Sequence, residues 1–372
     1  MVAIDGRLLA YRNGGIPRYV RGLLTHLPAA APDLLVLPVV NRPADLPDSP
    51  VLRVFTPPHH RLERVALGAE LAWWRAALIH STDFVPPYAP LARAVATVHD
   101  LAFLDSPDAL TASARRYYRG VEHALGTAER VIAVSETTRR RVIERLSIPP
   151  ERVATVYHGV DEGFFAPPPE PPATVLSREL GTDVAARLLV ERPLVLTVGT
   201  VEPRKRHGLL VGAVSELAGR RPDATPLLVV AGERGWNAAD TEVAIARLAE
   251  RGLAVRLPHV SDPALRALYR SATLLAMPSR DEGFGLPVVE AMAAGLPVVA
   301  ADRGALPEIM GDSGSLVSED SPVAWADAIA ALLDDAERRA GLSSAGRSRA
   351  ERFRWEETAR RTATVYREVL AG

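Results

Sequence analysis

The sequence predicts an α/β protein with two domains, each built on a parallel β-sheet. Its 372 residues exceed what one hydrophobic core usually holds, since domains average about 100–200 residues. Short apolar runs alternate with longer amphipathic stretches, which is typical of βαβ units whose strands are buried on both faces. A proline-rich segment at 167–172 interrupts this alternation, which then restarts. We therefore expect two α/β halves with a cleft between them.

The first domain is expected over residues 1–165. Helices should lie between its strands, for example Ile16–Leu27 and Glu136–Leu146, and the Ser135 hydroxyl is placed to cap the second of these. The expected strands are Val2–Asp5, Leu34–Val40, Val51–Phe55, Ala77–His80, Ala94–His99, Val131–Val134 and Val153–Val156.

Prolines mark the end of this domain. They cannot continue a helix or a central strand, so residues 166–193 are predicted to be an interdomain linker with room for one short helix. The second domain is expected over 194–354, and the last helix, within 355–372, is expected to cross back to the first domain. The strands expected in the second domain are Leu194–Val198, Leu227–Ala231, Ala254–Leu257, Thr273–Met277 and Pro297–Ala301.

Composition limits the kind of protein. The net charge is −1, so no overall field favours nucleic acid, and the absence of cysteine excludes disulfides and thiolate metal sites. The N-terminus lacks the pattern of a signal peptide, and no apolar run reaches the roughly 18 residues that span a bilayer. We expect a cytoplasmic enzyme.

One stretch of arginines and tryptophans keeps open a peripheral contact with the inner face of the membrane. Interspersed Glu63 and Glu70 favour an ordinary surface helix instead. The residues that suggest the contact are Arg61, Arg64, Trp73, Trp74 and Arg75.

Ligands of open parallel sheets bind beyond the carboxyl ends of the strands. Four polar or glycine-rich segments follow expected strands directly, and we therefore expect them to carry the chemistry. They are His99–Leu101, Gly199–Arg206, Gly232–Trp236 and Pro278–Pro287.

The last of these segments leads into a short helix, Val288–Ala294, with Pro287 in its first turn and Gly295 closing it. The glycines before the helix allow a ligand to approach the backbone, and the helix N-terminus favours phosphate. Glu290 should face inward, where its carboxylate can accept two hydroxyl hydrogen bonds from a ribose diol, and Glu282 should face the other end of the ligand. Alternatively, each glutamate could simply cap or face solvent.

Lys205 is the only lysine among 44 basic residues, and it lies next to Arg204 in the segment that follows a strand. A compact ammonium meets a phosphate as a point charge. The sequence contains no Asp-x-Asp triplet that would hold a metal, so protein cations are expected to neutralise a phosphate.

Residues 282–299, Glu-Gly-Phe-Gly-Leu-Pro-Val-Val-Glu-Ala-Met-Ala-Ala-Gly-Leu-Pro-Val-Val, resemble the donor-site signature of glycosyltransferase family 4. Residues 14–19, 99–101, 134–138, 157–161 and 199–205 agree with that family as well. The resemblance implies the GT-B architecture, with two Rossmann-like domains facing each other across a cleft that closes, and retaining transfer from a nucleotide sugar without a metal or other cofactor.

The resemblance also implies roles for individual residues. Glu290 would bind the ribose, Glu282 and His99 would lie at the donor sugar, and Arg204 with Lys205 would hold the diphosphate. Many family members have arginine where this chain has Thr200, so the phosphate clamp rests on Arg204 and Lys205. Residues expected to complete the nucleotide site are Gly14 and Gly15 from the first domain, and Gly199, Thr200, Gly283, Phe284, Gly285 and Leu286 from the second.

The function expected is therefore retaining hexosyl transfer from a nucleoside-diphosphate sugar to a hydroxyl of a glycan or lipid-linked saccharide, as in polysaccharide biosynthesis. The Glu-Pro-Arg-Lys loop and the 99–103 segment resemble mannosyltransferase-type members, which makes GDP-mannose the first donor to consider and a UDP-sugar the second. Three alternatives remain: a nucleotide-sugar epimerase of the same architecture, a phosphorylase that binds pyridoxal phosphate through Lys205, and a non-catalytic sugar-nucleotide binding protein.

Overall fold

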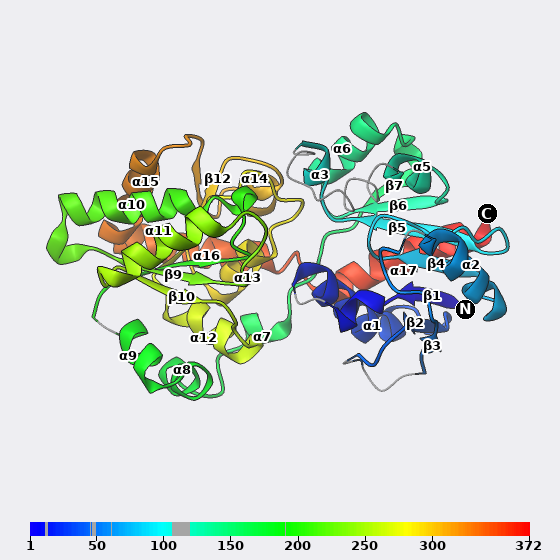
Figure 1. The fold of residues 1–372 in the computed structure, drawn as a ribbon, viewed down its shortest axis with the longest axis horizontal. Helices are drawn as coiled ribbons and strands as arrows, with labels where there is room; N and C mark the ends of the chain where they lie inside the picture. The colour runs from blue at the N-terminus through cyan, green and yellow to red at the C-terminus, as the bar shows by residue number, and fades with distance from the viewer. Residues whose placement is uncertain (12–13, 45, 47–49, 61, 106–119, 190) are drawn as a thin grey trace. The chain divides into compact units, whose positions relative to one another are not determined.

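The computed structural model describes residues 1–11, 14–44, 46, 50–60, 62–105, 120–189 and 191–372 (Figure 1). The chain divides into two compact units. Unit 1 comprises Met1–Gly159 and Phe353–Gly372, and unit 2 comprises Val160–Arg352. Each unit is an α/β structure built on one parallel sheet, which confirms the predicted fold class.

The sheet of unit 1 has seven strands in the order β3-β2-β1-β4-β5-β6-β7, and every pair is parallel. The order reverses direction between β1 and β4, as in doubly wound folds. The strands are β1 (Val2–Asp5), β2 (Val36–Val40), β3 (Leu52–Arg53), β4 (Leu78–Ser81), β5 (Arg93–Val98), β6 (Arg130–Ala133) and β7 (Val153–Thr155).

Alternate residues of these strands face opposite layers of helices. Val2, Ile4 and Leu78 contribute to a core shared with α1 (Gly15–Ala30) and α17 (Trp355–Ala371). Ala3 and Ile79 face the opposite way, into a core shared with α2 (Glu63–Trp73). The same face continues over α5 (Val121–Gly126) and α6 (Glu136–Leu146), and α3 (Ala102–Asp105) follows β5. The Ser135 hydroxyl accepts a hydrogen bond from the amide of Thr138, so the predicted cap of α6 is confirmed.

The C-terminal helix α17 lies beside α1 within unit 1 (Figure 1). Its first residue, Trp355, is 2% exposed and packs against two glycines. A Cβ at either Gly22 or Gly159 would lie 2.4 Å from the Trp355 ring, so both positions require glycine for steric reasons.

The sheet of unit 2 has six parallel strands in the order β10-β9-β8-β11-β12-β13, which reverses direction between β8 and β11. The short edge strand β13 was not predicted, because its three residues carry no clear apolar pattern. The strands are β8 (Leu194–Val198), β9 (Leu227–Ala231), β10 (Ala254–Leu257), β11 (Leu274–Met277), β12 (Val298–Ala301) and β13 (Ser315–Val317).

The segment expected to be an interdomain linker, 166–193, instead contains two helices of unit 2, and α8 packs against α12. Pro172 lies in the first turn of α8, where proline costs no hydrogen bond, so the proline cluster leads into a helix. The helices of unit 2 are α7 (Glu162–Phe165), α8 (Pro172–Leu180), α9 (Thr182–Leu188), α10 (His207–Arg220), α11 (Ala239–Glu250), α12 (Asp262–Ser271), α13 (Leu286–Ala294), α14 (Leu306–Met310), α15 (Pro322–Asp334) and α16 (Ala336–Ala350).

The described residues also contain short 3-10 turns at Arg7–Ala10, Pro150–Arg152, Pro203–Lys205 and Pro222–Ala224. None of the helices in the described residues is long and apolar enough to cross a lipid bilayer.

Candidate functional site

The candidate site of unit 2 lies where the strand order reverses, between β8 and β11. Parallel strands end at the same edge of the sheet, so the segments that follow β8 and β11 meet there. The turn Pro203–Lys205 belongs to the first segment, and Glu282 belongs to the second. The fold thus brings together two of the four segments that the sequence predicted to carry chemistry, and a third, Gly232–Trp236, pairs with the first of these two.

Glu282 is the centre of a charged cluster. Lys205 Nζ donates to Glu282 Oε1 at 2.5 Å, and Arg204 Nη1 lies 3.2 Å from Glu282 Oε2. Arg204 also donates to the Asp281 carbonyl at 2.6 Å and pairs with Glu202 at 2.9 Å. The side chains of Lys205 and Glu282 are only 12% and 9% exposed. The two cations are therefore held in fixed positions.

The protonation state of Glu282 follows from these contacts. Burial would raise the pKa of its carboxyl group, but the charges of Lys205 and Arg204 outweigh burial and lower the pKa to about 2. Glu282 is therefore a carboxylate at neutral pH, and it accepts hydrogen bonds only.

Two glycines allow the loops after β8 and β9 to approach each other. Gly199 has a φ of +144°, and a Cβ on Gly232 would lie 2.2 Å from the Gly199 carbonyl oxygen. Next to Gly199, the Val201 amide donates to the Glu233 carbonyl at 2.8 Å. Thr200 lies in this loop, between β8 and the turn Pro203–Lys205. The bracing holds the backbone from which Lys205 extends.

A further loop, residues 302–305, packs against Glu282, and the sequence did not indicate it. The Ala305 amide donates to the Glu282 carbonyl at 2.9 Å. Gly304 has a φ of +58°, and a Cβ there would lie 2.8 Å from the backbone of Glu282. In the sequence, the only sign of this contact between loop 302–305 and Glu282 is the glycine at position 304.

Helix α13 begins at this cluster. Gly285 is its N-cap in the left-handed region, with a φ of +94° and no side-chain cap, and Leu286 is its first residue. Pro287 lies in the first turn and Gly295 ends the helix with a φ of +76°, as predicted. Gly283 and Phe284 are buried between Glu282 and the helix. A helix N-terminus that has no side-chain cap favours an anion.

Glu290 faces the interior, as expected. It is 1% exposed, and its Oε2 accepts a hydrogen bond of 2.9 Å from the hydroxyl of Tyr269, on α12. Sequence reasoning missed Tyr269, because no motif connects it to Glu290. The tyrosine orients the carboxylate.

Unit 1 contains the remaining predicted residues. His99 follows β5, and its Nε2 lies 2.8 Å from the Thr82 carbonyl oxygen, which only accepts hydrogen bonds. Nε2 therefore carries the proton, and Nδ1 accepts from Nε2 of His158 at 3.2 Å. The two rings are stacked with centroids 5.2 Å apart. Burial lowers the pKa of both imidazoles, so both are neutral at neutral pH.

His158 is buried against His99. His207, the first residue of α10, is also buried, with its pKa lowered to about 3 by burial and by the nearby charge of Lys205. His123 and His259 are exposed.

Gly14 and Gly15 begin α1 in unit 1. Gly14 is the N-cap, with a φ of +126° and no side-chain cap, and Gly15 is the first helical residue. Tyr19, one turn further along α1, packs edge-on against His99 with ring centroids 5.1 Å apart. The start of α1 and His99 thus belong to one packed group. Among the residues that the structure describes, no three histidine or acidic side chains gather as a metal site would need.

Fold and site together define a two-unit, doubly wound α/β protein with a clustered set of cations beside a helix N-terminus. Comparison of the sequence with models of protein families supports the same class of protein. Residues 13–164 match the model described as Glycosyltransferase Family 4, and residues 192–335 match Glycosyl transferases group 1. The chain belongs to glycosyltransferase family 4.

Curated relatives are D-inositol 3-phosphate glycosyltransferases. The protein of Thermobispora bispora is 38% identical over 68% of this chain and 58% of its own length, so the chain spans less than two thirds of that relative. The protein of Corynebacterium glutamicum is 31% identical over 82% of this chain and 71% of its own. Among solved structures, HepE of Anabaena in complex with UDP-glucose covers 99% of both chains at 18% identity, with a TM-score of 0.75.

Proposed function

We propose that this protein is a glycosyltransferase that moves a hexose from a nucleoside-diphosphate sugar to a hydroxyl acceptor. The observation that carries the proposal is the Arg204–Lys205–Glu282 cluster next to the N-terminus of α13. Cations fixed beside a helix start suit the diphosphate of a sugar nucleotide. The names of the curated relatives and the UDP-glucose bound to HepE support the same substrate class.

The chemistry assigns a task to each group. The acceptor oxygen forms a bond to the anomeric carbon, while the bond from that carbon to the β-phosphate oxygen breaks and its electron pair leaves with the diphosphate. The acceptor oxygen attacks the face of the sugar from which the phosphate leaves, so the configuration of the anomeric carbon is retained. The acceptor proton passes to a leaving phosphate oxygen on that face. Arg204 and Lys205 stabilise the negative charge that develops on the diphosphate, and no metal is required in this scheme.

Glu282 has two tasks in this proposal. Its carboxylate holds both cations in place, and it accepts hydrogen bonds from the donor sugar hydroxyls. Glu290, oriented by Tyr269, accepts hydrogen bonds from the ribose diol. The glycines of the 283–285 loop and Gly199 allow the nucleotide to approach the backbone, and the roles of Gly14, Gly15 and His99 in unit 1 remain predictions from the family resemblance.

The sequence and the relatives suggest different donors and acceptors. GDP-mannose remains our sequence-based prediction, whereas the relatives are named for D-inositol 3-phosphate and the HepE complex contains UDP-glucose. A glycan or lipid-linked saccharide remains the predicted acceptor, with an inositol phosphate as the candidate that the relatives add. Family membership does not favour the epimerase alternative.

Two measurements test the proposal. Thermal shift with GDP, UDP and ADP should show one nucleotide raising the melting temperature, since binding to the folded state stabilises it. Sugar release or transfer should then occur from GDP-mannose, UDP-glucose or UDP-N-acetylglucosamine. Binding without turnover of any donor would favour a non-catalytic binding protein. Proton exchange at the sugar ring without acceptor would favour an epimerase, and a visible chromophore in the purified protein would favour the pyridoxal phosphate enzyme.

A further inference from the structure

Helix α2 of unit 1 exposes an apolar face. Residues 62, 65, 69, 72 and 73 follow the spacing of one helix side, and all five are exposed. Leu62 is 56% exposed, Val65 65% and Trp73 86%, with Ala69 and Ala72 between them. A surface helix of a globular protein usually presents charged residues on this side. Here the outer side carries none.

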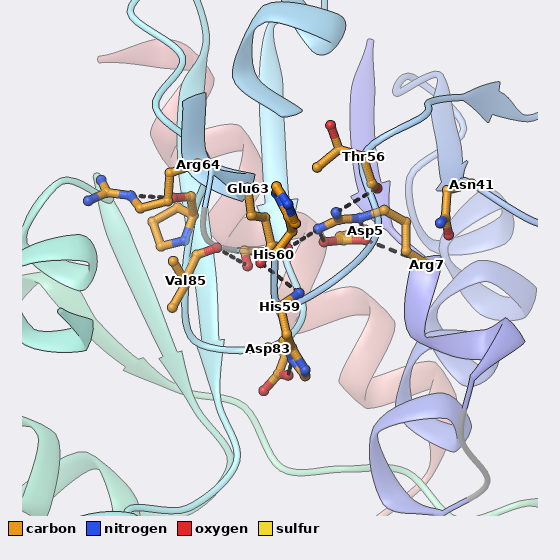
Figure 2. A network of polar contacts seen from close by, with 12 residues as sticks. Asp5, Arg7, Asn41, Thr56, His59, His60, Glu63, Arg64, Asp83 and Val85 are labelled. Carbon is orange, nitrogen blue, oxygen red and sulfur yellow. Dashed lines mark hydrogen bonds and ion pairs between the residues drawn. The ribbon is translucent and has the colours of Figure 1, made fainter. Parts of the chain in front are cut away.

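The charged residues of α2 instead face the protein. Glu63 is 6% exposed, forms an ion pair with the buried Arg7 and accepts a hydrogen bond of 2.8 Å from the His59 amide (Figure 2). Arg64 donates to the Pro86 carbonyl at 3.1 Å. Glu70 accepts from the Thr56 amide at 3.0 Å.

These contacts fix the orientation of the helix. Rotating α2 to bring its charges outward would remove Glu63 from the buried Arg7, which would keep only Asp5 as its ion-pair partner among the described residues, so rotation is unfavourable. In the sequence, Glu63 and Glu70 favoured an ordinary surface helix over a membrane contact. The structure removes this objection, because both carboxylates bond to groups of unit 1 on the inner side of the helix.

Neighbouring segments enlarge the apolar surface. Phe55 is 95% exposed, and its amide donates to Glu70, which places it beside the helix. Tyr88 is 59% exposed, and its amide donates to the Arg64 carbonyl at 2.7 Å. A Cβ on Gly68 would lie 1.9 Å from the Tyr88 carbonyl oxygen, so this segment crosses the helix in direct contact. We call the exposed side chains of Phe55, Leu62, Val65, Trp73 and Tyr88 the α2 surface.

Basic residues accompany the α2 surface. Arg53, Arg75 and Arg93 are exposed and come from the strands and the turn that flank the helix. The acidic residues of the described part of 50–93 are Glu63, Glu70 and Asp83, and each accepts a hydrogen bond from unit 1, Asp83 from His59 at 2.8 Å. The outward charge of this region is therefore positive.

We propose that the α2 surface docks onto a phospholipid bilayer that contains anionic lipids. Aromatic rings that are partly polar favour the headgroup region, aliphatic side chains enter the acyl boundary, and exposed arginines attract lipid phosphates. A second copy of this chain fits less well, because a two-fold contact would bring the same arginines of both copies near each other. The inference is independent of the glycosyltransferase proposal.

Vesicle flotation tests whether the α2 surface binds a bilayer. One set of vesicles contains phosphatidylcholine alone, and the other contains phosphatidylcholine plus phosphatidylglycerol. We expect binding to the anionic vesicles, and weaker binding as salt rises. The double variant Val65→Ser and Trp73→Ser should lower the partition coefficient by about tenfold or more, since it removes apolar contact area. The triple variant Arg53→Glu, Arg75→Glu and Arg93→Glu should abolish the preference for anionic vesicles.

Val243→Ser is the matched control, because Val243 is 50% exposed on α11 of unit 2 and should leave flotation unchanged. Unchanged melting temperatures would show that the variants fold. Failure to bind anionic vesicles, or equal binding by the double variant, overturns the proposal. Self-association without lipid that Trp73→Ser abolishes would overturn it in favour of a second copy.

Discussion

Lys205 Nζ lies 2.5 Å from Oε1 of Glu282, although 77 positions separate the two residues in the sequence. The pair joins the segment after β8 to the segment after β11, at the reversal of the strand order. The only lysine of the chain is thus held by the carboxylate at the start of the glycine-rich loop. This cluster and the neighbouring contact between Glu290 and Tyr269 lead to three predictions, and the buried His80 of unit 1 leads to a fourth.

Lys205→Met should lower turnover by about 10²-fold or more, the usual loss for one preorganised charge donor. Lys205→Arg should recover activity only in part, because the compact ammonium lies 2.5 Å from Glu282 Oε1 in a nearly buried position that a planar guanidinium cannot reproduce. Steady-state kinetics with the preferred donor measures both. Arg206→Met is the control, since Arg206 pairs with Asp320 instead. Full activity of Lys205→Arg would mean that only the charge matters.

Glu282 should make unit 2 sensitive to acid. Its folded pKa of about 2 lies below the ordinary value of 4.5, so its contribution is complete above about pH 4.5 and is lost as pH falls toward 2. The contribution of this pKa difference to the free energy of unfolding is about 3 kcal/mol. Denaturant unfolding of the wild type and of Glu282→Gln over this range measures it. Parallel stability curves for the two proteins would contradict the assigned pKa.

Tyr269→Phe should raise the donor KM by about 10-fold with a smaller effect on kcat, because the carboxylate of Glu290 loses a hydrogen bond that orients it. Tyr366→Phe is a suitable control. Tyr366 is also fully buried, but its hydroxyl contacts His80 in unit 1 at 2.6 Å. Equal effects of the two variants on KM would argue that Glu290 does not contact the donor.

His80 should destabilise unit 1 below neutral pH. Burial, together with repulsion from His99 once acid protonates that ring, lowers the pKa of His80 from 6.5 to about 3, so the unfolded state binds the proton more tightly. The stabilising effect is complete above about pH 6.5 and falls by about 1.4 kcal/mol per pH unit below it. Denaturant unfolding of His80→Gln should show a slope reduced by one proton relative to wild type. A wild-type slope in His80→Gln would contradict the prediction.

The strands were predictable because each buried strand of a parallel sheet is a continuous apolar run. Leu194–Val198, Leu227–Ala231 and Ala254–Leu257 match the structure at both ends. The place of the site followed from the same pattern, since polar segments that end parallel strands share one edge of a sheet. Edge strand β13 was missed, and only one short helix was expected where α8 and α9 lie, because short elements and prolines carry little periodic signal.

The linear pattern thus specifies which segments are strands, which are helices and which loops can bind a ligand, because local hydrophobic periodicity and glycine placement are written into neighbouring residues. It does not specify partners. Lys205 with Glu282, Tyr269 with Glu290, and the inward orientation of Glu63 on α2 depend on contacts between distant segments. The sequence around a charged residue does not differ according to whether its side chain faces water or a buried arginine. Only the packing of the folded chain determines the environment of that side chain.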